Sequence, residues 1–172
     1  MKEKLWYFFL DTKCKAYYLD KVYCRAKNND SKFNLLISVA TSGSIAVWTI
    51  WNKIPILWAV IIAVGQFSEI LKQHLPNLKN LKNLSDGKDK YGDLAMEAKF
   101  LFDDFVAGRI SEAKAQQKHR ELELKDNEIT KTISEADIKD EKRLSIEAHR
   151  DLNIFLNTHY QINHNFEVEK YF

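Results

Sequence analysis

The side chains that could perform chemistry in this chain are two cysteines, five histidines and a pair of adjacent aspartates. Cys14 and Cys24 lie ten residues apart, so a helix would separate them by about 15 Å, which favours two reduced cytosolic thiols over a disulfide or a metal pair. The histidines show neither the His-x-x-x-His nor the His-Glu-x-x-His spacing of zinc sites. Asp103 and Asp104 would point about 100° apart on a helix, which is typical of a solvated face.

Motifs that bind phosphate or present a nucleophile are also missing from the sequence. It contains no Gly-x-Gly-x-x-Gly run, no Gly-Lys-Ser/Thr phosphate loop and no Gly-x-Ser-x-Gly elbow. We therefore expect a protein that is not an enzyme and that uses no cofactor and no metal ion.

The composition favours helices and a partner other than nucleic acid. Five glycines and two prolines among 172 residues are too few for a chain rich in β-turns. Residues 1–90 hold 14 Lys and Arg against 7 Asp and Glu, whereas residues 91–172 hold 12 against 17. Because only the first half is basic, and its basic residues flank apolar runs, we expect them beside a membrane and expect no direct binding of nucleic acid.

Two apolar runs predict a transmembrane helical hairpin. Residues 33–51 contain no charge, and as a helix they would measure roughly 28 Å, close to the bilayer core of about 30 Å. Residues 54–71 contain one ionisable side chain, Glu69, near the end of the run. Only Asn52 and Lys53 separate the two runs, and Pro55 suits the first turn of the second helix. The alternative is a soluble protein that buries both runs in its core.

The charges that flank the hairpin predict its orientation. Basic residues precede the first run and follow the second, whereas the turn carries only Lys53, so both termini are expected in the cytoplasm. The predicted fold class is therefore an all-α membrane protein with three parts. These are an N-terminal amphipathic cytoplasmic helix (residues 1–32), the hairpin (residues 33–71, with spans 33–51 and 54–71) and a cytoplasmic helical region (residues 72–172).

Small and polar residues along both spans are the candidate functional residues. In lipid, such side chains allow close helix approach and hydrogen bonds between helices, so they predict either a dry helix interface or the wetted wall of a pore, and both favour a homo-oligomer. Glu69 could form a cation-selecting ring at a pore mouth, or pair locally with Lys72. The candidates for the pore or helix interface are Ser38, Thr41, Ser42, Gly43, Ala59, Ala63, Gln66 and Glu69.

The segments on either side of the hairpin predict further helices. Residues 3–27 form an aromatic and basic amphipathic pattern, which could lie in the lipid headgroup region or dock onto the later helices. We expect a break at residues 28–31 and a turn at residues 85–87. An apolar stripe from Tyr91 to Phe105 predicts a helix ended by Gly108. A solvated helix with a thin apolar seam through Leu122, Ile129 and Ile133 is expected over residues 111–133. A last helix is expected from about Ser134, and its apolar stripe is Leu144, Ala148, Leu152, Phe155, Leu156 and His159.

The hairpin, the aromatic helix before it and the helical region after it together resemble the SLATT family of bacterial effectors. The resemblance covers about Lys13 to Ala115, through KCKAYYLDKVYCRAKNNDSKF, both spans and YGDLAMEAKFLFDDFVAGRISEAK. It implies a protein of the bacterial inner membrane, encoded beside a nucleotide-messenger synthase, a reverse transcriptase or a retron. It also implies oligomerisation and permeabilisation of that membrane when phage infection is sensed, with no catalytic residues.

The expected function follows from this resemblance and from the hairpin. The first expectation is an antiphage or abortive-infection effector whose partners are the lipid bilayer, further copies of itself and a separate sensor or messenger-producing protein. A passive membrane-anchored adaptor, which recruits a cytosolic partner through its helical domain, is the second. A soluble all-helical interaction domain is the third.

Overall fold

The computed structural model describes residues 1–41, 56, 59–60, 63–67, 70, 80–135 and 141–161. In these ranges the chain forms helices and no strand, which confirms the predicted all-α class. The helices are α1 (Lys2–Thr41), α5 (Leu81–Val106), α6 (Glu112–Glu135) and α7 (Lys142–Tyr160).

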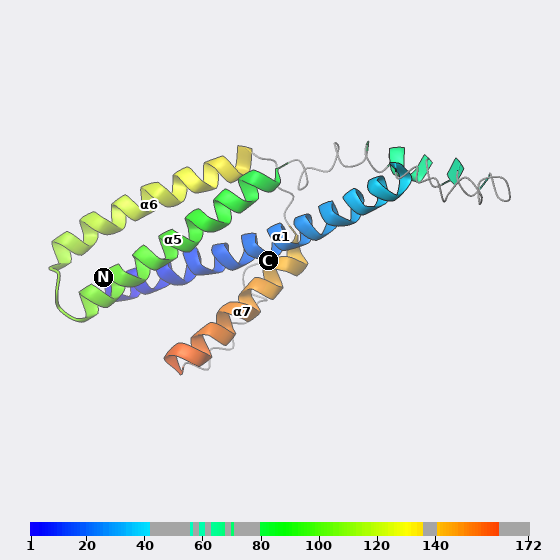
Figure 1. Cartoon of the computed structure of the whole chain (residues 1–172). Helices are drawn as coiled ribbons and strands as arrows, with labels where there is room; N and C mark the ends of the chain where they lie inside the picture. The colour runs from blue at the N-terminus through cyan, green and yellow to red at the C-terminus, as the bar shows by residue number, and fades with distance from the viewer. Residues whose placement is uncertain are drawn as a thin grey trace.

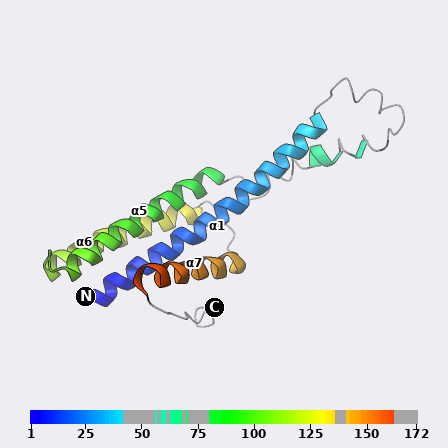
Figure 2. The ribbon, with the colours of Figure 1, turned by 60° about the horizontal axis from the view of Figure 1, so that its bottom comes forward.

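Helix α1 is the axis of the molecule. Its 40 residues extend for about 60 Å. Helices α5 and α6 run antiparallel to each other along one side of α1, and α7 packs on another side (Figures 1 and 2). The C-terminal part of α1 continues beyond the ends of the other helices (Figure 1).

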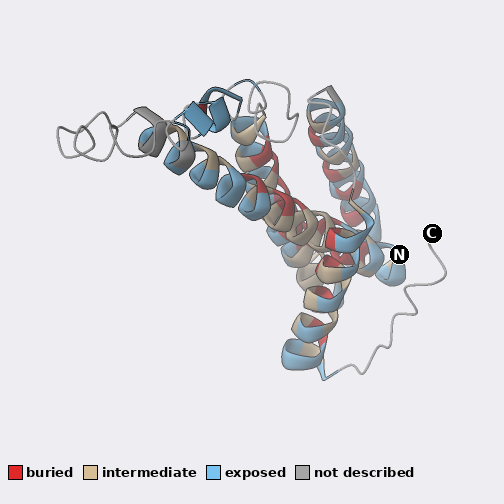
Figure 3. Cartoon of the chain, turned by 90° about the vertical axis from the view of Figure 1, so that its right-hand side faces the viewer, coloured by how far each residue is buried: buried red, intermediate tan, exposed pale blue. Residues whose placement is uncertain are grey.

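Residues 5–26 of α1 supply the centre of the hydrophobic core. Buried side chains lie where the helices face one another (Figure 3). The sequence left open whether this aromatic helix lies in the headgroup region or docks onto the later helices, and in the structure it docks onto them. The buried apolar side chains of α1 are Leu5, Phe9, Leu10, Leu19, Val22 and Ala26.

The expected break at residues 28–31 is wrong, because α1 is one continuous helix through this tract. Asn28, Asn29 and Ser31 are exposed, and the Asp30 carboxylate accepts a hydrogen bond of 2.9 Å from the Asn34 side chain one turn later. Such residues disfavour the helix interior only weakly when their side chains reach solvent, so the flanking helix continues through them.

The expected turn at residues 85–87 is also wrong, because α5 begins at Leu81 and includes Gly87. Likewise α6 continues to Glu135, so the last helix does not begin at Ser134, and the described start of α7 is Lys142. Gly108 does follow the end of α5 and has a φ of 68°, a conformation that favours glycine.

Two glycines of α5 provide a matched test of this packing. A Cβ on Gly87 would lie 3.1 Å from Cδ1 of Ile133 and 3.4 Å from Cδ1 of Leu19, whereas one on Gly92 would meet nothing within 4 Å. We expect Gly87→Leu to lower the free energy of unfolding by roughly 1–3 kcal/mol through overpacking. Gly92→Leu should raise it by up to about 1 kcal/mol, because leucine favours the helix. Urea denaturation followed by circular dichroism measures both, and equal effects would contradict the close approach of α6 at Gly87.

The predicted spans lie only partly within the described residues. Residues 33–41 of the first span form the last part of α1, and residues 56, 59–60, 63–67 and 70 belong to the second span. Among the described residues, no helix combines the length and the apolar character needed to cross a bilayer.

Candidate functional site

The candidate site is the end of the molecule where α1 leaves the helical bundle. Of the predicted interface residues, Ser38 lies exposed on α1 and Thr41 is the last residue of that helix. Ala59, Ala63 and Gln66 are also exposed in the single chain, so these three side chains and that of Ser38 lie outside the hydrophobic core. Ser42, Gly43 and Glu69 lie outside the described residues.

Large apolar side chains at this end are left uncovered by the bundle. Ile56 is 78% exposed and Phe67 is 61% exposed, and Val60, Val64 and Ile70 are exposed as well. Leu35 on the projecting part of α1 is exposed in the same way. Figure 3 shows these regions in pale blue, away from the buried residues between the helices. The described part of the second run therefore presents apolar surface that the rest of the described chain does not bury.

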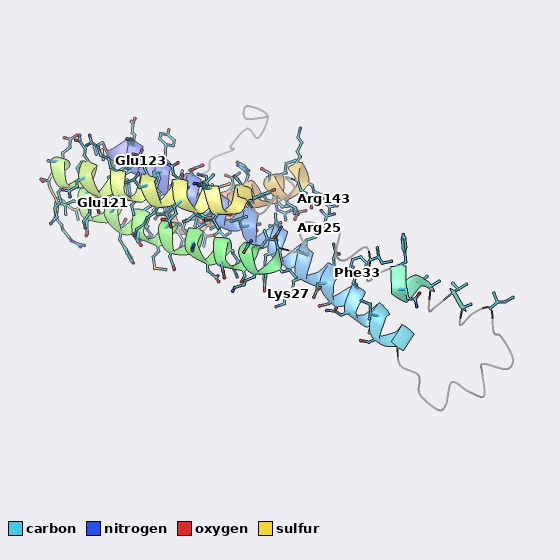
Figure 4. The ribbon with its side chains drawn as sticks, turned by 90° about the horizontal axis from the view of Figure 1, so that it is seen from above. Arg25, Lys27, Phe33, Glu121, Glu123 and Arg143 are labelled. Carbon is cyan, nitrogen blue, oxygen red and sulfur yellow. The ribbon has the colours of Figure 1, made fainter. Side chains whose placement is uncertain are left out.

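Basic side chains lie where the projecting part of α1 begins. Lys27 and Lys32 of α1 and Lys82, in the first turn of α5, are exposed. Figure 4 labels Lys27 near the start of α5 and Phe33 further along α1, towards its C-terminal end. An apolar segment preceded by exposed lysines is the arrangement expected where a chain enters a membrane from the cytoplasm.

Ion pairs hold the outer helices on α1. The Lys15 ammonium lies 2.9 Å from the Asp126 carboxylate on α6, and that of Lys21 lies 2.5 Å from Asp151 on α7. Partial burial lowers the pKa of Lys15, but hydrogen bonds to Asp11 and Asp126 outweigh burial and raise the pKa above its ordinary value. These contacts fix α6 and α7 along the half of α1 that lies inside the bundle.

A third pair lies close to the point where α1 leaves the bundle. The Arg25 guanidinium pairs with the carboxylate of Glu141, the residue directly before α7. The Glu141 backbone N–H also donates a hydrogen bond of 3.1 Å to the Tyr18 hydroxyl. Figure 4 shows Arg25 near Arg143, in the first turn of α7. The start of α7 is therefore tied to α1 beside the candidate site.

The two cysteines and the adjacent aspartates are packing or surface side chains in the described part of the chain. Cys14 and Cys24 are free thiols, and burial, aided by the charge of Asp11, raises the pKa of Cys14 to about 11. Asp103 and Asp104 pair with Lys99 and Arg109 as surface carboxylates. Among the described residues, no group of three or more His, Cys, Asp or Glu side chains is placed to hold a metal ion.

His119 is a buried polar residue whose role sequence reasoning missed. Its side chain is 2% exposed, its ring centroid lies 4.9 Å from that of Phe8, and neither ring nitrogen has a hydrogen-bond partner among the described residues. The Glu123 Oε1 atom lies 3.3 Å from His119 Nδ1, within ion-pair distance but without a hydrogen bond. Lys4 in turn pairs with Glu123. The spacing of Ala115, His119 and Leu122 was the available signal, because it continues the apolar seam of α6.

The burial of His119 predicts a pH dependence of stability. Burial lowers the pKa of His119, and this effect exceeds the opposing influence of Glu123. The unfolded chain therefore takes up the proton first, so the free energy of unfolding should fall as the pH drops below about 6.5 and level off once the folded form is also protonated. Urea denaturation from pH 7.5 to 5 measures this.

Two variants isolate the contribution of His119. His119→Leu should remove part of the fall in stability, because leucine does not titrate. Gln116→Leu should keep the wild-type pH profile, because it places the same leucine on the exposed face of α6 without changing a titratable group. Identical pH profiles for the wild type and His119→Leu would show that His119 does not titrate across folding.

Comparison of the chain with known proteins finds no matching family model, no matching curated relative and no similar solved structure.

Proposed function

We propose that this chain is a membrane effector of a bacterial antiphage or abortive-infection system, which oligomerises and permeabilises the inner membrane. The proposed membrane location rests on one observation. The residues described between positions 56 and 70 expose apolar surface at the end of the molecule where α1 projects beyond the bundle. The exposed lysines Lys27, Lys32 and Lys82 support entry from the cytoplasmic side. The resemblance to the SLATT family supports the defence role and a separate sensor or messenger-producing partner.

In the proposed mechanism, the helical bundle stays in the cytoplasm and the hairpin enters the lipid. Copies then associate through the small and polar residues of the two spans, because such residues allow close helix approach in lipid. The continuous helix α1 joins the two parts, so a change in the bundle can be transmitted to the first span without an intervening loop.

The test is dye release from liposomes. The full chain is reconstituted into anionic phospholipid vesicles that contain carboxyfluorescein, and membrane association is measured on the same samples by flotation. The proposal expects flotation with the vesicles together with dye release. Vesicles that bind the protein but retain the dye would overturn permeabilisation, and a protein that does not float would overturn the membrane assignment.

A passive membrane adaptor is the second candidate function. The exposed apolar side chains Met96 and Phe100 on α5 and Leu124 on α6 favour it, because they offer a contact surface to a cytosolic protein. This candidate expects membrane association without dye release, so the liposome experiment separates it from the effector.

Assembly through the spans gives a separate prediction. Gly43→Leu together with Ala63→Leu should shift the protein towards monomers, because larger side chains prevent close helix approach. Ala107→Leu is the matched control, since Ala107 is exposed and lies outside both spans. Chemical cross-linking in membranes, read on a denaturing gel, measures the oligomer distribution, and an unchanged distribution would reject these faces as the interface.

A further inference from the structure

A groove between α5 and α7 runs over the N-terminal part of α1. Its volume is about 450 Å³, within the range of roughly 300–1,000 Å³ that is typical of small-molecule sites. Its lining includes Phe9 and Lys13 of α1, Ala95 of α5 and Tyr160, the last residue of α7. Figure 2 shows α5 and α7 on different sides of α1, which leaves this part of α1 between them.

One lysine of the groove, Lys13, has no carboxylate partner among the described residues. The Lys13 ammonium lies 5.1 Å from the ring centroid of Tyr17 and 5.0 Å from that of Phe155, and no carboxylate of the described residues forms an ion pair with it. Burial lowers the pKa of Lys13. The other lysine of the groove, Lys99, lies 2.6 Å from Asp103 and is already compensated. A single anionic group placed beside Lys13 would therefore neutralise the charge that the groove leaves unpaired.

The remaining lining of the groove suits a flat apolar ring. The Phe155 ring centroid lies 6.0 Å from that of Tyr160, and both aromatic side chains line the α7 side of the groove. Met96 on the α5 side is exposed, and its flexible thioether packs favourably against aromatic rings. Gly92 adds open space, because a Cβ at this position would meet no atom within 4 Å.

We propose that this groove binds a small organic anion that combines one aromatic ring with one negative charge. The anionic group lies beside the Lys13 ammonium, and the ring lies between Met96 and Phe155. Ligands with several negative charges are disfavoured, because Lys13 is the lysine of the groove that Asp103 does not compensate. The site is separate from the predicted spans and does not depend on the proposed membrane function.

The experiment uses 2-naphthoate as the probe and 2-naphthalenemethanol as its uncharged counterpart. The full chain is purified in whichever of aqueous buffer or mild detergent keeps it monodisperse, the same solution serves as the blank, and isothermal titration calorimetry measures binding. Naphthoate is expected to bind at least about ten-fold more tightly than the alcohol. Lys13→Met, which keeps the aliphatic stem but removes the charge, should weaken naphthoate binding about ten-fold and leave the alcohol unchanged.

Two further variants make the test specific for the groove. Gly92→Leu fills the open space on α5 and should abolish binding of both probes. Lys4→Ala removes an exposed lysine of the same helix that lies outside the groove, so it should leave both affinities unchanged. Circular dichroism confirms that each variant is folded. Equal affinities for naphthoate and the alcohol, or wild-type naphthoate binding by folded Lys13→Met or Gly92→Leu, would overturn the proposal.

Discussion

Phe9→Ala is expected to lower the free energy of unfolding by about 3–5 kcal/mol. Phe9 is 2% exposed, and its ring centroid lies 5.6 Å from that of Trp6 and 6.2 Å from that of Phe155 on α7. Truncation removes the burial of the ring and leaves a cavity where α1 meets α7. Because small domains have a total stability of about 5–15 kcal/mol, the loss should be visible as a large shift in the urea midpoint.

Tyr7→Ala is the matched control for this prediction. Tyr7 lies two residues earlier on the same helix and is 63% exposed, so its truncation should change the stability by less than about 0.5 kcal/mol. The pair tests whether α1 docks onto the later helices, as opposed to lying in the headgroup region. If Phe9→Ala changed the free energy of unfolding by as little as Tyr7→Ala, the docking of α1 onto the later helices would be refuted.

Val60→Asp is expected to prevent stable insertion into the membrane. Val60 is exposed and lies near the middle of the predicted second span. On the scale of helix insertion, replacing valine by aspartate at the centre of a span costs about 3 kcal/mol. The variant should therefore move from the membrane pellet that survives an alkaline carbonate wash to the soluble or aggregated fraction, and dye release from liposomes should be lost with it.

Leu124→Asp is the matched control, because it introduces an aspartate on the helical bundle instead of in the predicted span. Leu124 is 70% exposed on α6, so an aspartate at this position meets water and should leave membrane association unchanged. Carbonate-resistant Val60→Asp protein with unimpaired dye release would place Val60 outside the lipid, and it would remove the main support for the proposed hairpin.

The apolar stripes of the helices were predictable from the sequence. Leu94, Ala98 and Leu101 of α5 are buried as their spacing predicted, and so are Leu144 and Leu152 of α7. The stripe is readable because a helix that packs on one side repeats its apolar residues every three or four positions. The solvated character of α6 and its seam through Leu122 and Ile129 followed from the same pattern. His159, expected in the α7 stripe, is exposed instead.

The two expected interruptions failed for different physical reasons. At residues 28–31 the turn-forming side chains point to solvent, and their small helix penalty is outweighed by the helix on both sides. At Gly87 the absence of a side chain allows close packing of the helices, because Ile133 of α6 and Leu19 of α1 approach the place where a Cβ would lie. The local sequence shows that a residue is small or polar, but it does not show which residue of another helix packs against it.

The all-α class, the apolar faces of the helices and the helix end at Gly108 could be predicted from the sequence, because these features depend on local propensity and periodicity. The tertiary structure was needed to see that α1 is the centre of the bundle, that His119 is buried beside Phe8 and that Lys13 lies in a groove where no carboxylate of the described residues pairs with it. The physical reason is that burial and pairing depend on which faces meet. Those contacts join residues more than a hundred positions apart, such as Lys15 with Asp126 and Lys21 with Asp151.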